Sequence, residues 1–400
     1  MRILLLNQYY PPDLAPTGSV LHDLARDLQT RGHEIHVVCS RASYDSERLY
    51  SSEELIDDIH IHRISTLEFS KRHILSRFGS YASYFARTWS IMRKLPRPQC
   101  VVSLTTPPYI GLLGSYVSRR WNISHVSWVM DLYPDILQAH GLLNSKSIIY
   151  DALKRISSYF LNHSDLIVTL GPWMASRVDK YLTPGRHSTW IPLWATQDMA
   201  PWATGLRNSI REANRWGPEE LVIMYSGNMG LGHTFDDILW AAQKIGRSGV
   251  RWVFSGGGRR HDEIKKFASS HPELPIDLLP YARPVQLREH LSAADLHLVT
   301  LHQSWQGLMV PSKIHAIFAL GKPVLYVGGS ENEIASWIRE AKAGWVVNQG
   351  DREELLKAID ESRDPSTRRQ KGESAARFAK AHFSQQTNCN RISQSLEKLL

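Results

Sequence analysis

The chain has 400 residues, a formal net charge of +8, and 42% hydrophobic and 22% charged residues. This length supports two ordinary domains, and the composition excludes a disordered chain. The three cysteines are far apart, so neither a disulfide framework nor a zinc site follows, and we expect a reducing, cytoplasmic setting. The opening MRILLLNQYYPP predicts a buried strand, not a signal peptide. No apolar run reaches the ~18 residues of a membrane-spanning helix.

The first elements in chain order predict a βαβ unit. Residues 3–6 are an apolar run, a proline-rich loop continues through Gly18, and apolar residues at helical spacing occupy 20–28. Gly32 ends this helix, and a second apolar run follows at 34–39. A strand, a glycine-containing loop, a helix and a strand are typical of nucleotide-binding α/β domains.

The acidic stretch of Glu53, Glu54, Asp57 and Asp58 has no histidine partner, and the chain has no DxD motif. We interpret this stretch as a solvated loop. The sequence predicts neither a metal site nor a cofactor.

Residues 69–98 contain seven basic residues and no acidic one. Aromatic residues are interleaved with them, and such a helix suits an anionic membrane surface, where rings lie at headgroup depth and long cationic chains reach phosphates. An ordinary solvated helix and a nucleic-acid or protein contact are the alternatives. The predicted membrane-contact residues are Lys71, Arg72, Arg77, Phe78, Arg87, Trp89, Arg93 and Lys94.

The strand pattern continues and then restarts after residue 215. Further strands are predicted at 100–104, 125–129 and 165–169, and then at 221–225, 252–254, 276–279, 296–300, 323–327 and 344–347. The fold class is therefore α/β, with two Rossmann-like doubly wound domains facing a central cleft. We place the N-terminal domain at 1–195 and the C-terminal domain at 196–383. Residues 384–400 are expected to form a helix that can pack back on the N-terminal domain.

Three glycine-containing loops follow predicted strands. Gly18 precedes the first helix, whose free N–H groups and dipole attract anions. Gly227 and Asn228 lie in SGNMG after the first strand of the second half, and Gly257 is the centre of GGG after the next strand. Glycine lets the backbone approach a ligand closely, so these loops are candidate diphosphate contacts, and plain structural turns are the alternative.

The strongest local signal is QGLMVPSK at 306–313, followed by ALGKPVLY at 319–326. Pro311 and Ser312 can open a helix. Lys313 in its first turn is unfavourable for the helix dipole, and a bound phosphate would compensate for this cost. We therefore predict that Lys313 contacts an anionic ligand, and a surface lysine is the alternative.

These motifs together resemble a known family. The stretches that carry the resemblance cover nearly the whole chain: NQYYPPDLAPTG with RGHEIHVV, DLYPD at 131–135, YSGNMG, FSGGG, QGLMVPSK and ALGKPVLY. The chain is similar to the retaining glycosyltransferases of GT-B fold, a large family that includes sucrose-phosphate synthase. It most resembles the bacterial WbuB-like and colanic-acid transferase-like branch, which builds O-antigen and exopolysaccharide.

The resemblance implies that backbone groups of the glycine-containing loops and of the VPSK loop hold the donor. The residues that take this role by resemblance are Gly18, Gly227, Asn228, Gly307, Leu308 and Met309, with Lys313 nearby. Asp131 would lie on the acceptor side, where it orients the acceptor or serves only as a structural carboxylate.

One departure from the family pattern concerns the ribose. Members commonly place two glutamates eight positions apart around the VPSK loop, and here Leu308 and Ala316 occupy those positions. Neither side chain accepts a hydrogen bond from a ribose hydroxyl. Glu331 and Glu333 are the candidates to replace them.

The resemblance implies a metal-independent glycosyltransferase on the inner face of the cell membrane. It would move a sugar from a nucleotide donor, expected to be UDP-linked, to an undecaprenyl-diphosphate-linked or other glycan acceptor, with retention. Amides, a lysine and helix N-termini would stabilise the leaving diphosphate. A UDP-sugar 2-epimerase of the same fold and a non-catalytic sugar-binding relative remain alternatives.

Overall fold

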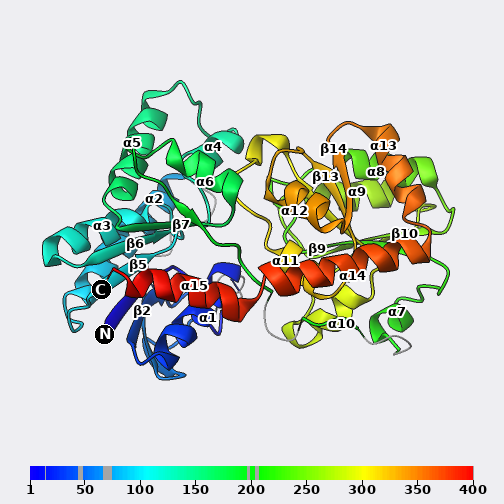
Figure 1. Cartoon of the computed structure of the whole chain (residues 1–400). Helices are drawn as coiled ribbons and strands as arrows, with labels where there is room; N and C mark the ends of the chain where they lie inside the picture. The colour runs from blue at the N-terminus through cyan, green and yellow to red at the C-terminus, as the bar shows by residue number, and fades with distance from the viewer. Residues whose placement is uncertain (14, 44–47, 66–73, 196–198, 203–206, 400) are drawn as a thin grey trace. The chain divides into compact units, whose positions relative to one another are not determined.

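A computed structural model describes residues 1–13, 15–43, 48–65, 74–195, 199–202 and 207–399, without the side chains of 74–78 and 80. The chain divides into two compact units (Figure 1). The N-terminal unit comprises Met1–Leu193 and Gln385–Leu400, and the C-terminal unit comprises Trp194–Ser384. Each unit is a Rossmann-like α/β domain, as the sequence predicts.

The N-terminal unit is built on an eight-stranded sheet of order β3-β4-β2-β1-β5-β6-β7-β8. All neighbouring strands are parallel except the antiparallel pair β3 and β4. Leu4 of β1 lies opposite His36 on one side and Val101 on the other. The strands are β1 (Arg2–Leu6), β2 (Glu34–Ser40), β3 (Glu53–Ile56), β4 (Ile59–Ile64), β5 (Cys100–Ser103), β6 (Ser124–Trp128), β7 (Leu166–Thr169) and β8 (Thr189–Trp190).

Helices cover both faces of this sheet (Figure 1). Helices α1 and α15 lie side by side on one face, and α2, α3 and α5 form a layer on the other. Buried residues of β1, β5, α2 and α3 form the core beneath that layer, Leu4, Val101, Tyr84 and Val117 among them. The helices are α1 (Pro16–Thr30), α2 (Ile74–Met92), α3 (Ile110–Trp121), α4 (Asp135–Ala139), α5 (Ile148–Asn162), α6 (Pro172–Asp179) and α15 (Gln385–Glu397).

The C-terminal helix α15 belongs to the N-terminal unit, where it packs on α1. Cys389, Ile392 and Leu396 are its buried residues of apolar character. Polar contacts also join α15 to α1 and to the residue that follows it. Ser393 Oγ donates to the Asp27 carboxylate at 2.6 Å, and Arg31 pairs with Glu397 at 3.3 Å.

The interpretation of residues 53–58 as a solvated loop was wrong. They form β3 and the turn into β4, in which Asp57 and Asp58 have φ of 51° and 58°. Two consecutive positive φ values are typical of the tight turns that match strand twist. Arg63 of β4 is 2% exposed and forms an ion pair with Glu54 across the hairpin.

The C-terminal unit is a six-stranded parallel sheet of order β11-β10-β9-β12-β13-β14. Every strand lies where the sequence predicts one. Because the strands are parallel, the carboxyl ends of β9, β10, β12 and β13 meet at one edge of the sheet. The strands are β9 (Leu221–Ser226), β10 (Val250–Ser255), β11 (Ile276–Leu279), β12 (Leu296–Leu301), β13 (Val324–Gly328) and β14 (Gly344–Asn348).

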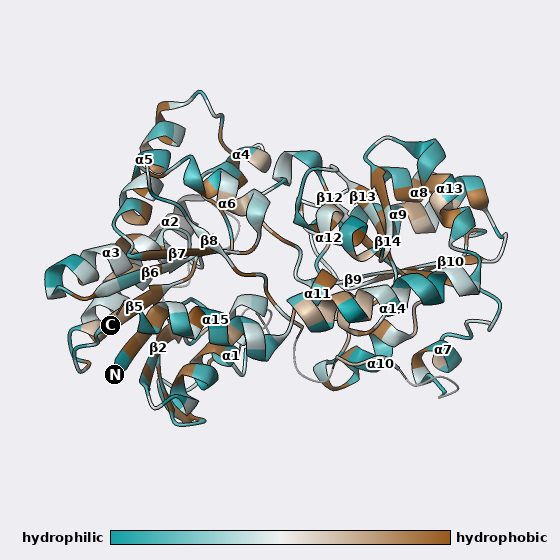
Figure 2. Ribbon diagram, viewed as in Figure 1, coloured by the Kyte–Doolittle hydropathy of each residue, from teal (hydrophilic) through white to brown (hydrophobic). Residues whose placement is uncertain are grey.

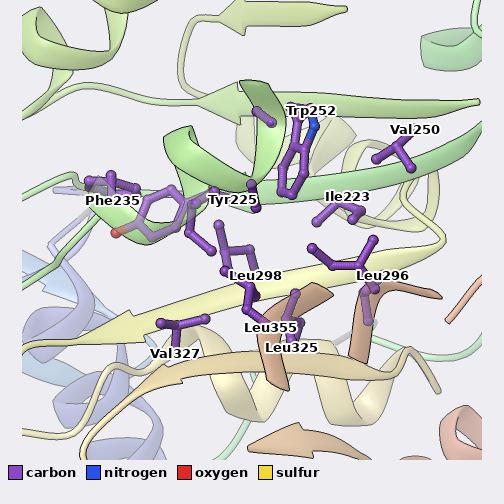
Figure 3. Close-up of a cluster of buried hydrophobic side chains, with 14 of the residues drawn as sticks. Ile223, Tyr225, Phe235, Val250, Trp252, Leu296, Leu298, Leu325, Val327 and Leu355 are labelled. Carbon is purple, nitrogen blue, oxygen red and sulfur yellow. The ribbon is translucent and has the colours of Figure 1, made fainter. Parts of the chain in front are cut away.

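Apolar side chains fill the space between this sheet and its helices (Figure 3). Ile223, Trp252 and Leu298 are at most 1% exposed, and the Tyr225 and Phe235 rings meet at 4.9 Å between centroids. Figure 2 shows the same pattern along the chain, with hydrophobic strands inside and polar helical faces outside. The helices are α7 (Ser209–Ala213), α8 (Asp236–Ile245), α9 (His261–Ser270), α10 (Leu287–Ser292), α11 (Lys313–Ala319), α12 (Glu333–Ala341), α13 (Arg352–Glu361) and α14 (Pro365–His382).

None of the helices in the described part of the chain is both long and apolar enough to cross a membrane.

Candidate active site

Two glycine loops pack against each other at the carboxyl edge of the C-terminal sheet. The Gly227 amide donates to the Ser255 carbonyl at 2.9 Å, and the Met229 amide donates to the Gly257 carbonyl at 2.6 Å. A Cβ atom at Gly256 would lie 2.2 Å from the Gly227 carbonyl oxygen. Gly227 and Gly256 both have φ of 126°. Backbone therefore touches backbone here, which only glycine permits.

Asn228 and Gly257 lie at the open side of these loops. Asn228 is exposed, and its Oδ1 atom covers Gly258, where a Cβ would approach within 2.4 Å. Gly257 lies beneath the ring of Tyr281; a Cβ atom on Gly257 would lie 3.2 Å from the Cε2 atom of this ring. Tyr281 is 57% exposed, so its ring presents an exposed aromatic area beside the glycine loops.

Lys313 begins helix α11 and reaches the same loops. Its Nζ atom lies 3.4 Å from the centroid of the Tyr225 ring and 3.4 Å from the position of a Cβ on Gly227. The amine is buried and has no hydrogen-bond partner among the described residues. Burial lowers the pKa of Lys313 well below its ordinary value. A buried amine without a hydrogen-bond partner, at the edge where the glycine loops lie, is arranged to receive an anion.

His233 and Arg260 complete the polar wall of the glycine loops, and the sequence analysis missed both. His233 Nδ1–H donates to the Thr300 carbonyl at 2.6 Å, and burial together with the Lys313 charge lowers the pKa of His233 to about 3. Arg260 is the second residue after the GGG run; it donates to the His233 carbonyl at 2.7 Å and pairs with Glu263 at 2.9 Å. A basic residue close to a glycine run was the available signal.

The loop before α11 crosses the same edge. Gly307 has φ of 68°, Leu308 is 3% exposed, and the Leu308 amide donates to the Trp305 carbonyl at 3.1 Å. Met309 is half-buried. The amide of Gln306 occupies the space beside Gly329, where a Cβ would clash with it. Leu308 therefore fills an apolar position and brings no carboxylate.

Glu331 and Glu333, the two candidate ribose contacts, differ in their exposure to solvent. Glu331 is exposed, whereas Glu333 is 1% exposed in the first turn of α12. A helix N-terminus stabilises a carboxylate. Asn332 caps this helix by accepting from the Ala335 amide at 3.0 Å, and its Nδ2 atom donates to Tyr326 Oη at 2.8 Å. Burial and then the Glu333 charge raise the pKa of Tyr326.

In the N-terminal unit, the packing of Gly18 favours the structural alternative. A Cβ there would lie 3.0 Å from the Tyr9 carbonyl oxygen, so glycine lets α1 pack against the loop after β1. The Gly18 amide donates to the Ala15 carbonyl at 3.0 Å. This amide is therefore not one of the free N–H groups of the helix start, and its predicted role toward the donor remains untested.

Asp131 follows β6 at the carboxyl edge of the N-terminal sheet. The amides of Met130 and Asp131 both donate to Thr105 Oγ1, at 3.3 and 3.1 Å, which fixes the loop. Among the described residues none hydrogen-bonds to the Asp131 carboxylate. Burial raises its pKa to about 6. Such a carboxylate can change its protonation state near neutral pH.

The basic segment is only partly described. Lys71 and Arg72 lie outside the described residues, as do the side chains of Arg77 and Phe78. Arg87, Arg93 and Lys94 are exposed, whereas Trp89 is half-buried.

Two aromatic side chains of this helix pack toward the protein, whereas the side chain of Phe78 lies outside the described residues, so membrane contact through the rings stays a prediction. The Trp89 ring contacts Tyr116 and Trp121 of α3, with centroid distances of 5.2 and 6.0 Å. Tyr84 is 1% exposed, and its hydroxyl donates to the Asn7 carbonyl at 3.0 Å. The sequence could not separate rings that face the core from rings that face solvent.

No group of three or more His, Cys, Asp or Glu side chains within the described ranges could hold a metal ion.

Comparison with known proteins gives the same assignment to both units. Residues 17–194 match the Glycosyltransferase Family 4 model, and residues 220–362 match the Glycosyl transferases group 1 model. The Probable glycosyltransferase WbjE of Pseudomonas aeruginosa is 27% identical over 296 residues, which cover 73% of each chain. The Putative colanic acid biosynthesis glycosyl transferase WcaI of Escherichia coli is 22% identical, covering 80% of this chain and 82% of the relative.

Solved structures share the fold over the full chain. Sucrose-phosphate synthase from Thermosynechococcus elongatus has a TM-score of 0.81 at 14% identity, covering 100% of this chain and 99% of that one. HepE of Anabaena in complex with UDP-glucose has a TM-score of 0.70 at 14% identity, covering 100% of both. With one glycosyltransferase family model on each Rossmann-like unit, the chain belongs to the glycosyltransferases of GT-B fold.

Proposed function

We propose that this glycosyltransferase moves a sugar from a UDP-linked donor to a membrane lipid-linked glycan acceptor in the biosynthesis of a bacterial surface polysaccharide, with retention of configuration and without a metal. The names of the relatives support the polysaccharide part. WcaI is assigned to colanic acid biosynthesis, and WaaG, which shares the fold at a TM-score of 0.69, to lipopolysaccharide biosynthesis.

One observation carries the proposal: the buried amine of Lys313 lies without a hydrogen-bond partner beside the backbone of Gly227. A diphosphate bound there would supply the missing partners and would raise the pKa of the lysine again. Charge-assisted hydrogen bonds to phosphate are about twice as strong as neutral ones. The same contacts strengthen as negative charge develops on the leaving diphosphate.

The UDP assignment rests on the neighbouring groups. HepE, whose fold matches, binds UDP-glucose. In this chain the exposed ring of Tyr281 lies beside Gly257, where it can stack on a base while the glycine loops hold the phosphates. Glu333 is the proposed ribose contact, because it begins α12, the helix that follows β13.

The proposed retention of configuration rests on the leaving phosphate acting as the base. Retaining hydrolases use two carboxylates about 5 Å apart, and the sequence offers no convincing pair. We propose that the leaving phosphate itself accepts the proton of the acceptor hydroxyl on the same face of the sugar. Lys313 and those glycine-loop amides that are not bonded within the loops then stabilise the departing charge, and the chain has no DxD motif for a metal. Asp131 orients the acceptor.

A panel of nucleotide sugars tests the proposal. Purified protein is incubated with each donor and with undecaprenyl-diphosphate-linked glycan, and the products are separated by mass spectrometry and NMR. Transfer that gives the donor's own anomeric configuration supports it. Isomerisation at C2 of the sugar would identify an epimerase instead, and donor binding without turnover would identify a non-catalytic relative.

A further inference from the structure

The layer of α2 and α3 has an extreme charge distribution. From residue 69 to residue 130 the sequence contains no aspartate or glutamate and nine basic residues: Lys71, Arg72, Arg77, Arg87, Arg93, Lys94, Arg97, Arg119 and Arg120. Arg119 and Arg120 end α3 and are exposed. Only Asp151 is acidic on α5, where Lys154 and Arg155 are basic and all three are exposed. The positive charge of the layer therefore extends beyond α2 to α3 and α5.

Exposed large apolar side chains lie on the same layer, in α3 and α5. In α3 the exposed residues are Leu112, Tyr116, Arg119 and Arg120, which repeat at helical spacing on its outer side. Leu112 is 36% and Tyr116 52% exposed. At the start of α5, Ile148 is 88% and Ile149 63% exposed, and hydrophobic colour marks this stretch in Figure 2.

Side-chain contacts join the three helices into one surface. Trp89 of α2 contacts Tyr116 of α3 edge to face, with centroids 5.2 Å apart. Arg119 of α3 donates to the hydroxyl of Tyr159 of α5 at 2.8 Å. Tyr159 is itself 42% exposed. From Tyr159 to Ile148 the surface extends about 16 Å along α5.

We propose that the outer surface of the α2–α3–α5 layer binds an anionic lipid bilayer, with Leu112, Tyr116, Ile148 and Ile149 inserted among the headgroups and acyl chains. Arginine and lysine side chains around them reach lipid phosphates. Helix α2 supplies charge, because its described rings pack inward, and α3 and α5 supply the apolar anchors. This inference rests on the proposed function in one respect: a lipid-linked acceptor would be met at this surface.

A bilayer fits this surface better than the other occupants. A second copy of the chain would bring a second layer of the same positive charge against the first. Nucleic acid would use the charge, but it would not account for two exposed isoleucines at the start of α5. An anionic bilayer uses both features, because it offers phosphates at its surface and hydrocarbon below.

Vesicle sedimentation of the full chain tests the proposal. The vesicles contain equal parts of phosphatidylglycerol and phosphatidylcholine, and phosphatidylcholine alone is the comparison. Two double variants are used, Ile148→Ser with Ile149→Ser, and Leu112→Ser with Tyr116→Ser. Each should lower the partition coefficient by about tenfold or more, since each removes two apolar anchors. Leu55→Ser and Val285→Ser change side chains that are 60% and 94% exposed elsewhere, and neither should alter it.

Several outcomes would overturn the proposal. Unchanged partitioning of both double variants would show that charge alone binds the vesicles. Absence of binding by the unmodified chain would remove the bilayer as occupant. Dimerisation in light scattering that Ile148→Ser with Ile149→Ser abolishes would assign the surface to a second copy. UDP binding measured by calorimetry in every variant separates these failures from a failure of the glycosyltransferase proposal, because the substituted residues lie outside the donor loops.

Discussion

The Nζ atom of Lys313 lies 3.4 Å from the centre of the Tyr225 ring, and no described residue accepts a hydrogen bond from it. A ring face favours a cation, yet burial disfavours one, and here burial prevails, because it lowers the pKa of Lys313 well below its ordinary value. Without a ligand, the C-terminal unit therefore carries a group that costs stability. Sites that bind or transform ligands often keep such groups.

Replacement of Lys313 by methionine separates the two roles. We expect Lys313→Met to lower kcat by about 100- to 1,000-fold, because a donor to the developing diphosphate charge is lost. We also expect it to stabilise the unliganded protein by about 1–2 kcal/mol, since a buried amine without a partner is removed. Turnover assays and thermal unfolding measure both effects.

A matched control is Lys371→Met. The Lys371 Nζ atom lies 4.7 Å from the centroid of the Trp345 ring, away from the glycine loops. This variant should retain turnover. If Lys313→Met instead kept full activity, Lys313 would have no place in the mechanism.

UDP binding should take up about one proton through Lys313. In the free protein burial lowers the pKa of this amine, and a bound diphosphate raises it, so between the two pKa values binding protonates the group. Affinity then falls as the pH rises through the pKa of the bound state. Calorimetry in two buffers of different ionisation enthalpy measures the uptake. Lys313→Met should abolish it, and a wild-type binding enthalpy independent of buffer would contradict the assignment.

Gly256→Ala should destabilise the C-terminal unit more than Gly350→Ala does. Both glycines have positive φ, 126° and 89°, so both substitutions carry backbone strain of about 1 kcal/mol or more. Only at Gly256 would the new Cβ meet a neighbour, the Gly227 carbonyl at 2.2 Å, whereas nothing lies within 4 Å at Gly350. We expect a further loss of about 2 kcal/mol from overpacking. Chemical denaturation compares the pair, and equal losses would show that the two loops are not packed as described.

Asp131 should give a pH dependence to both activity and stability. Burial raises its pKa from 3.8 to about 6. A carboxyl whose folded pKa exceeds the unfolded value contributes stability below pH 3.8 that is lost as the pH rises through about 6. Asp131→Asn should therefore stabilise the protein at pH 8 by about 1–3 kcal/mol.

Activity should follow the ionised form of this carboxylate. If Asp131 orients the acceptor as a carboxylate, kcat/KM rises with pH through about 6 in the unmodified protein, and Asp131→Asn removes this rise. Asp151→Asn, at an exposed position of α5, is the control and should leave the profile unchanged. A profile that Asp131→Asn does not alter would leave Asp131 a structural carboxylate.

Apolar runs made the parallel strands predictable, because strands buried on both faces read as continuous hydrophobic segments. The β3–β4 hairpin escaped prediction for the opposite reason. Its strand 53–56 begins with two glutamates, and its turn uses Asp57 and Asp58 where asparagine and glycine are the usual signal. The buried charge of Arg63 pairs with Glu54, which no apolar pattern reveals.

The site could be predicted as far as the loops that form it. Gly227, Gly257 and Lys313 were found because each follows a strand or opens a helix. The contact of Lys313 with Tyr225 was not predicted, because it depends on how the Lys313 side chain reaches from α11 to β9. Tyr281 was missed for the same reason: it approaches the glycine loops from the segment after β11, about 25 residues along the chain from Gly257, and no motif links the two.

Helix α15 has a consequence for synthesis of the protein. Since α1 packs on α15, helix α1 lacks this partner during synthesis until the residues of α15, Leu396 among them, have emerged. The whole C-terminal unit is translated in that interval, so it can reach its native state before the N-terminal unit does. During that time Asp27 of α1 and Arg31, directly after this helix, lack their contacts with Ser393 and Glu397, so the N-terminal unit is incomplete while the rest of the chain is made.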